Sequence, residues 1–185
     1  MEIQAVILAG GKSSRMGTDK GLLEIAGKPM VQHLIETLQP LAANSWISTS
    51  NKMYIQFGVS LLTDEYDSIG PLGGIHIALQ RATTPFVLVV SVDAPFVSKE
   101  CILKLKGSCE QDTIVISRCA GKPYPLIGCY PVTALKKLEE YIDQGNRSVF
   151  GFLESQKVKE IEFSDQLNDC FRNINTPQDL SEVQG

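Results

Sequence analysis

The sequence predicts an α/β domain built around a largely parallel β-sheet. Apolar segments of strand length alternate with amphipathic segments of helix length along the chain, which is the pattern of strands joined by crossover helices. Residues 86–92 are nearly all apolar and mostly β-branched, as expected of a central strand that is buried on both faces. The first apolar strand runs into two glycines and nearby cations, so we expect a ligand at the carboxyl ends of the strands.

The first half of the chain provides four of the predicted strands, at residues 3–8, 46–49, 59–63 and 86–92, and a short extended piece at 22–25. Pro29 suits the first turn of a helix, and the apolar residues after it fall on one helical face until Pro40 ends the pattern. A second helix is predicted over residues 72–79, directly after a Gly-Pro turn.

The second half continues the alternation. Ser98 can cap a helix that carries three apolar residues on one face. Strands are predicted at 113–117 and 126–130, and Gly121, Pro123 and Pro125 lie between them. A helix over 132–142 and an edge strand at 158–163 follow. The last helix is predicted to start at Thr176, where Asp179 nearly completes a capping box.

Composition limits the class of protein. The 185 residues suit one domain spanning 1–185, 43% of them are hydrophobic, and the net charge of −4 offers no broad attraction for nucleic acid or an anionic membrane. The five cysteines are odd in number and form no C-x-x-C pair, and only two histidines are present. We therefore expect reduced core thiols rather than a zinc site. With no basic leader and no apolar run long enough to span a bilayer, a cytoplasmic protein is expected.

The glycine-rich segment after the first strand suits a chain of phosphates. Gly10 and Gly11 let the backbone turn tightly and bring N–H groups close to a ligand, and cations follow at Lys12, Arg15 and Lys20. A Walker A loop would need a further glycine five positions before Gly11, and the dinucleotide fingerprint would need glycines where Lys12 and Arg15 stand. The segment predicts a polyphosphate site of another kind.

Two aspartates follow predicted strands. Asp93 ends the most buried strand, and a carboxylate placed opposite a triphosphate needs a cation between them, for which Mg²⁺ is the usual choice. Asp64 follows an apolar run, and a carboxylate there can accept hydrogen bonds from adjacent N–H donors of a ligand. A loop aspartate without a ligand remains the alternative at both positions, and Glu65 and Asp67 compete with Asp64 for the role.

The chain resembles nucleotidyltransferases with a GT-A-like fold, and within them the molybdenum cofactor guanylyltransferase branch. The first motif reads L-A-G-G-K from Leu8, then R-M-G from Arg15 and D-K-G from Asp19. Three shorter pieces follow in the same order as in that branch: G-P-L-G-G from Gly70, D-A-P from Asp93 and N-I-N-T-P from Asn173. The resemblance covers nearly the whole chain and implies a single-domain, Rossmann-like three-layer sandwich.

The resemblance also implies a reaction, the transfer of GMP from GTP to molybdopterin carrying molybdenum, with release of pyrophosphate. Leu8, Ala9, Gly10 and Gly11 would cradle the nucleotide. The catalytic set would be Arg15, Lys20 and Asp93, with Lys12 on the phosphates and Asp93 as the Mg²⁺ ligand. Asp64 would contact the nucleotide. Relatives often have a base-contacting Asn near Thr49, for which Asn51 is the substitute here.

Acceptor contacts are implied at Asn173 and Asn175, and at Arg147, which could equally be a solvated loop residue. A GTP-binding accessory protein and molybdoenzyme chaperones are the candidate partners. Two other readings stay open: a related enzyme that uses CTP or a sugar-phosphate acceptor, and a GTP-binding module without catalysis. Related cytidylyltransferases usually read L-A-A-G where this chain has L-A-G-G, which favours guanine.

Overall fold

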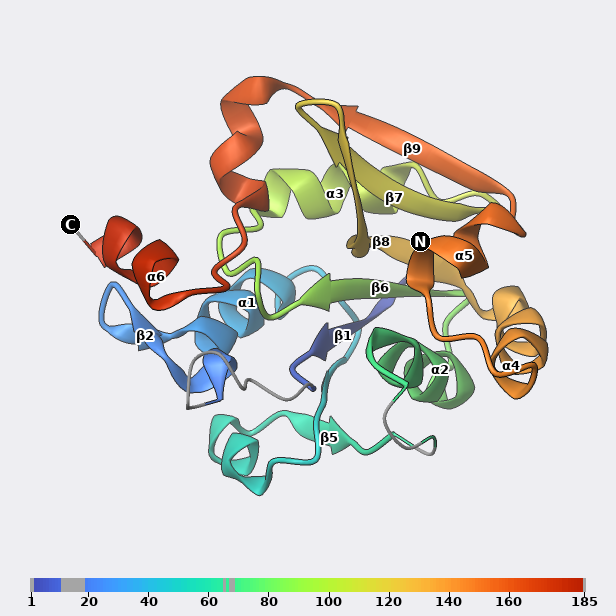
Figure 1. Ribbon diagram of the computed structural model, residues 1–185, viewed down its shortest axis with the longest axis horizontal. Helices are drawn as coiled ribbons and strands as arrows, with labels where there is room; N and C mark the ends of the chain where they lie inside the picture. The colour runs from blue at the N-terminus through green and yellow to red at the C-terminus, as the bar shows by residue number, and fades with distance from the viewer. Residues whose placement is uncertain (1, 11–18, 65, 67–68, 185) are drawn as a thin grey trace.

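The computed structural model describes residues 2–10, 19–64, 66 and 69–184 (Figure 1). Its centre is a seven-stranded sheet with the order β5-β4-β1-β6-β8-β7-β9. The strands are β1 (Gln4–Leu8), β4 (Ser45–Ser48), β5 (Ser60–Leu62), β6 (Phe86–Ser91), β7 (Ile114–Cys119), β8 (Lys122–Pro131) and β9 (Val158–Phe163). A separate two-stranded ribbon pairs β2 (Glu24–Ile25) with β3 (Lys28–Pro29).

The sheet is mostly parallel, as the sequence predicts. β1 pairs in parallel with both β4 and β6, and β4 pairs in parallel with β5. β8 runs antiparallel to its neighbours β6 and β7, whereas β9 returns parallel to β7 at the sheet edge. The reversed strand β8 thus separates the parallel strands β5, β4, β1 and β6 from the β7–β9 pair.

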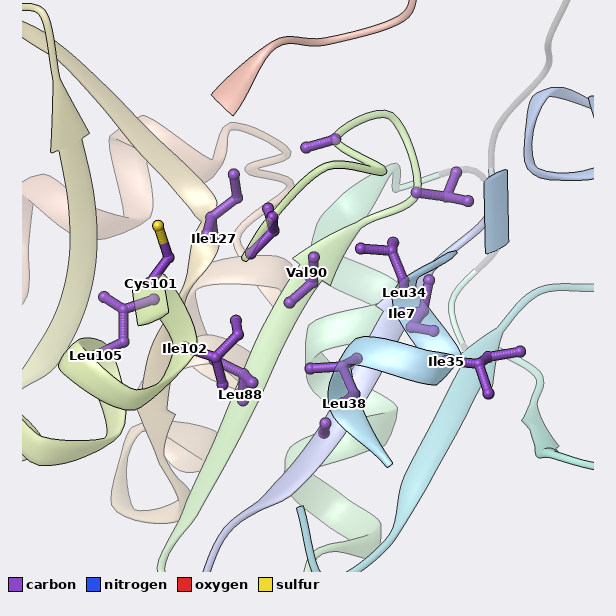
Figure 2. Packing of buried hydrophobic residues seen from close by; sticks show 14 of the residues in the cluster. Ile7, Leu34, Ile35, Leu38, Leu88, Val90, Cys101, Ile102, Leu105 and Ile127 are labelled. Carbon is purple, nitrogen blue, oxygen red and sulfur yellow. The ribbon is translucent and has the colours of Figure 1, made fainter. Parts of the chain in front are cut away.

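Helices cover both faces of the sheet, which gives three layers. One core contains α1 (Met30–Leu38) and α3 (Lys99–Gly107), and the other contains α2 (Pro71–Arg81), α4 (Leu135–Asp143) and α5 (Val149–Glu154). The period of two along a strand divides its side chains between the faces, so Ile7 joins the first core and Val6 the second. Figure 2 shows side chains from α1 and α3 converging on β1 and β6.

Two local predictions are wrong, and both involve proline. Pro29 is not in the first turn of α1: it ends strand β3 with an extended ψ of 143° and occupies the N-cap position. Pro123 and Pro125, expected from the sequence to lie between two strands, are instead in the first half of β8. This half of β8 extends beyond β6, whose pairing begins at Ile127, so the missing proline N–H groups interrupt no ladder with β6.

The carboxyl-terminal segment returns to the end of β6. After a 3₁₀ helix (Asp165–Phe171), the N–H of Ile174 donates to the carbonyl of Asp93 at 2.8 Å. The predicted capping box of α6 (Pro177–Gln184) is present, because Thr176 Oγ1 accepts from the Asp179 N–H while Asp179 Oδ2 accepts from the Thr176 N–H. Backbone N–H groups of Asn175 and Thr176 hold the pKa of Asp179 below its usual value.

Gly128 on β8 offers a test of the sheet packing. A Cβ at this position would lie 2.4 Å from the carbonyl oxygen of Val115 on the neighbouring strand, and backbone cannot move aside easily. We expect Gly128→Ala to lower the free energy of unfolding by about 1–3 kcal/mol, as measured by urea denaturation. Gly107→Ala is the control, since nothing lies within 4 Å of its added methyl group, and it is expected to stabilise by about 0.4–1 kcal/mol. Equal stability of the two variants would contradict the packing described here.

Candidate active site

Lys20 and Asp93 meet at the carboxyl ends of β1 and β6. These strands are parallel neighbours, with Leu8 opposite Ser91 at the last paired position. Lys20 opens the 3₁₀ turn η1 (Lys20–Leu22), and its Nζ lies 3.4 Å from Asp93 Oδ1 and donates to Asn175 Oδ1 at 2.9 Å. Three segments that are far apart in sequence therefore converge on one ammonium group.

This cluster is reachable by a ligand. The side chains of Lys20 and Asp93 retain 18% and 33% of their exposure, so the pair is partly desolvated but not sealed. An ion pair of this kind contributes at most about 1 kcal/mol to stability. The cation and the carboxylate can therefore exchange partners with a bound phosphate or metal ion at small cost.

Asp19 anchors the turn that carries Lys20. Its carboxylate Oδ1 accepts the N–H of Gly21 at 3.2 Å and the buried hydroxyl of Tyr54 at 2.5 Å. Its Oδ2 accepts from Asn51 Nδ2 at 2.8 Å. Burial, together with the Asp19 carboxylate beside it, raises the pKa of Tyr54 well above its usual value, so the phenol stays protonated and donates.

Sequence reasoning missed this cluster. From the sequence, Asn51 is expected to be a substitute base contact. In the structure, its side-chain oxygen instead caps the 3₁₀ helix η2 (Lys52–Phe57) by accepting from the Met53 N–H, and its amide donates to Asp19. Tyr54 lies in that helix and carries no motif of its own. The available signals were the Asx cap at Asn51 and a tyrosine in an otherwise exposed turn.

Asp64 lies after β5, beside the start of α2. Its Oδ1 accepts the hydroxyl of Ser48 at 2.9 Å, and a Cβ on Gly73 would lie 2.7 Å from its Oδ2. Burial raises the pKa of Asp64, while the Ser48 hydrogen bond opposes that rise. A Cβ on Gly74 would meet both Ser48 Oγ and Leu8 Cδ2. The two glycines thus bring α2 into contact with this carboxylate and with the end of β1.

The start of the glycine-rich segment is partly engaged by the sheet. The N–H of Ala9 donates to the carbonyl of Ser48 at 3.0 Å, and the carbonyl of Leu8 accepts from Val92 at 3.0 Å. Gly10 follows the carboxyl end of β1 and is exposed. Gly11, Lys12 and Arg15 lie outside the described residues.

A pocket of about 520 Å³ lies next to the Lys20 cluster and shares Asn175 with it. Asn173, one of the residues expected to contact the acceptor, also lines it. The other lining residues come from β8 and from the carboxyl-terminal segment, and they include Lys122, Tyr124, Phe171 and Arg172. Arg172 is paired with Glu182.

Arg147 is not brought to this cluster. Its Nη1 donates to the carbonyls of Ile142 and Asn146 at 2.9 and 2.7 Å, which caps the end of α4. In Figure 1, α4 lies at the opposite end of the long axis from α6, the helix that follows Asn175. The pairing of Arg147 with helix carbonyls is a local structural role that the sequence alone did not separate from phosphate binding.

Residues 5–158 match the model of the MobA-like NTP transferase domain. The chain belongs to this family. It is 35% identical over 188 residues to the molybdenum cofactor guanylyltransferase of Histophilus somni, covering 98% of this chain and 96% of that protein. The enzyme of the same name from Vibrio campbellii is 34% identical over 181 residues, with 96% and 92% covered. The chain is therefore a nucleotidyltransferase.

A solved structure gives the same result for the fold. The molybdopterin-guanine dinucleotide biosynthesis protein A of Archaeoglobus fulgidus superposes with a TM-score of 0.80 at 26% identity, covering 98% of this chain and 96% of that one. The fold class predicted from the sequence is thus confirmed.

No helix in the described part of the chain is long and apolar enough to cross a membrane.

The Ser48–Asp64 contact can be tested without any ligand. Ser48→Ala removes a hydrogen bond that favours the charged carboxylate, so we expect the pKa of Asp64 to rise further above its usual value. NMR titration of the side-chain carboxyl carbons measures it, and Asp64→Asn assigns the signal. Ser45→Ala, at the other end of β4, is the matched control. An unchanged or lowered pKa in Ser48→Ala would contradict the geometry.

Proposed function

We propose that the protein transfers GMP from GTP to molybdopterin carrying molybdenum, releasing pyrophosphate, and that residues 1–185 form one domain for this purpose. The observation that carries the proposal is the convergence of Lys20, Asp93 and Asn175 beside a pocket. It supports placing a nucleotide on one side of the cluster and an acceptor on the other. The names of the relatives support the choice of substrates.

In the proposed complex, the triphosphate lies along the glycine-rich segment. Leu8, Ala9, Gly10 and Gly11 line it, and Lys12 and Arg15 neutralise its outer phosphates. Lys20 lies nearest the reacting α-phosphate, a placement supported by its position at the shared edge of β1 and β6. Since the Ala9 N–H is already bonded to Ser48, Ala9 contributes through its carbonyl or methyl group.

Asp93 and Asn175 fit a magnesium ion that arrives with the nucleotide. Mg²⁺ is usually held by one or two carboxylates together with substrate phosphates rather than by an all-protein cage. No cluster of three or more His, Cys, Asp or Glu side chains suited to a metal occurs among the described residues. The partly exposed Asp93 carboxylate and the Asn175 amide oxygen are hard oxygen donors. Bound there, the ion would reduce the negative charge on the α-phosphate and on the departing pyrophosphate.

We assign guanine recognition to Asp64. Its carboxylate is half-buried, and Ser48 occupies Oδ1 with one hydrogen bond while Oδ2 faces Gly73. Each carboxylate oxygen can accept more than one hydrogen bond, so both remain able to receive the adjacent N1–H and N2–H of guanine.

The acceptor is assigned to the pocket shared by Asn173 and Asn175. Lys122 and Arg172 are the two cations of its lining and would bind the phosphate of the acceptor, although Asp169 and Asp179 also line the pocket and balance their charge. We leave Arg147 out of this site because its guanidinium caps α4.

The reaction requires no enzyme nucleophile. The terminal phosphate of the pterin attacks the α-phosphorus in line, and the protein contributes positioning and charge neutralisation. Lys20 lies between the two substrates, since it reaches both Asp93 and the pocket residue Asn175. We place the reaction in the cytoplasm, where the five free cysteines stay reduced. An accessory GTP-binding protein and molybdoenzyme chaperones are the proposed partners.

Substrate choice is tested with a panel of GTP, CTP, ATP and UTP, with and without Mg²⁺ and metallated pterin, by following pyrophosphate and dinucleotide products. Of the four nucleotides, we expect only GTP to be turned over. We expect this turnover to require both Mg²⁺ and the pterin. Turnover with CTP, or with a sugar phosphate as acceptor, would replace this proposal with the related enzymes. GTP binding without pyrophosphate release would indicate a module without catalysis.

Lys20→Ala tests the proposed catalytic cation. Loss of one preorganised charge at the reacting phosphate is expected to lower kcat by about 10²–10³-fold, with a smaller change in the KM for GTP. Steady-state kinetics measures both. Lys28→Ala is the control, because Lys28 is exposed and pairs with Glu36 on the surface. A change in KM with an intact kcat would assign Lys20 to nucleotide binding alone.

A further inference from the structure

Lys20 is held by a half-buried neighbour that is not among the proposed substrate contacts. This neighbour is Asp19, whose two carboxylate oxygens are shared among Gly21, Tyr54 and Asn51. The N–H of Leu22 also donates to the Asp19 carbonyl at 3.1 Å, so Asp19 caps the turn η1 with both its backbone and its side chain. The direction of the Lys20 side chain therefore depends on how Asp19 is held.

Tyr54 fixes Asp19 by contact as well as by hydrogen bonding. The tyrosine is fully buried, and a Cβ on Gly21 would lie only 2.2 Å from its hydroxyl oxygen and 2.9 Å from Val92 Cγ2. The phenol thus fills the space beside Gly21, between η1 and the chain that leaves β6. Only glycine allows the turn to lie this close to the ring.

Asn51 ties the same turn to the end of β4. Its own N–H donates to Thr49 Oγ1 at 3.1 Å, while its amide donates to Asp19. Thr49 follows Ser48, which holds the proposed base-binding Asp64. The region proposed to read the base and the turn that presents Lys20 are therefore connected by a short series of hydrogen bonds.

We propose that Tyr54, together with Asn51, is a positioning residue for the reaction: by holding Asp19 it orients Lys20 toward Asp93 and Asn175. The inference rests on the proposed function of Lys20. Neither Tyr54 nor Asn51 touches substrate in this arrangement. Their removal would leave the other proposed substrate contacts in place but would misdirect Lys20.

Tyr54→Phe removes only the hydroxyl that binds Asp19. Because a misplacement of about 1 Å can cost on the order of 10²-fold in rate, we expect kcat to fall by about tenfold to a hundredfold with little change in the KM for GTP. Tyr130→Phe is the matched control: Tyr130 is equally buried, and its hydroxyl donates to the Pro125 carbonyl at 2.8 Å, in the core on the opposite face of the sheet. It is expected to lose stability without losing kcat.

A side-chain exchange provides a rescue. Asp19→Asn leaves an oxygen for Tyr54 and Gly21 but presents an amide to the amide of Asn51, and Asn51→Asp places two carboxylates together. The double variant Asp19→Asn/Asn51→Asp restores one donor–acceptor pair, and Asp at position 51 still caps η2. We expect each single variant to lose kcat and the double variant to recover at least part of it.

Crystal structures of the wild type and Tyr54→Phe give a readout that needs no turnover. We expect the Lys20 Nζ–Asp93 Oδ1 separation to lengthen beyond ion-pair distance in the variant. The inference is overturned if Tyr54→Phe keeps wild-type kcat and the same separation, if Tyr130→Phe loses as much kcat, or if the double variant is no better than the worse single one. A wild type that forms no dinucleotide would refute the proposed function instead, and the structures would still decide whether Tyr54 positions Lys20.

Discussion

Parallel pairing of β1 with β6 is the constraint on which the site depends. Five consecutive residues of β1, from Gln4 to Leu8, pair with Val87 to Ser91, so both chains leave the sheet at one edge and side by side. The partly exposed Lys20–Asp93 ion pair is too weak to create this arrangement. It follows from the strand register, and the register is fixed because a shift of one residue would turn Val6 and Ile7 toward the wrong cores.

The carboxyl-terminal segment adds what the parallel strands lack, which is a second side to the site. The bond from the Ile174 N–H to the Asp93 carbonyl places Asn175 against Lys20, and the capping box at Thr176 and Asp179 fixes the turn that follows. Lys20 therefore has two oxygen partners before any ligand arrives. Exchanging them for phosphate oxygens requires little reorganisation, because the ammonium already lies where the three segments meet.

The elements that the sequence predicts well are those whose pattern is local. The composition of residues 86–92 predicts a buried strand, which is β6. Ser98 caps α3 by accepting from the Cys101 N–H, and Thr176 and Asp179 form the predicted capping box of α6. Lys20 and Asp93 could be paired because strand ends of a parallel sheet share an edge. The hydrogen bond from Tyr54 to Asp19 could not be predicted. The direction of the Tyr54 side chain depends on how η2 packs against η1, and no sequence spacing marks such a long-range contact. The two prolines of β8 led to a wrong prediction because the cost of a missing N–H depends on whether a neighbouring strand needs it as a donor. At Pro123 and Pro125, β8 extends beyond its pairing with β6.

Burial of Asp64 explains how the proposed site would discriminate between bases as well as bind one. A carboxylate that burial holds at a raised pKa is poorly solvated, and leaving it without donors costs more than an exposed carboxylate would. Guanine offers two adjacent donors, whereas adenine presents the acceptor N1 at the corresponding edge, so the carboxylate would keep only its hydrogen bond from Ser48. A site in which the wrong ligand leaves a partly buried acceptor short of donors rejects that ligand more strongly than one that loses contact alone. In the proposed complex Ser48 and Gly73 would serve selectivity, because the hydroxyl binds Oδ1 of Asp64 and the missing side chain of Gly73 leaves room for its Oδ2.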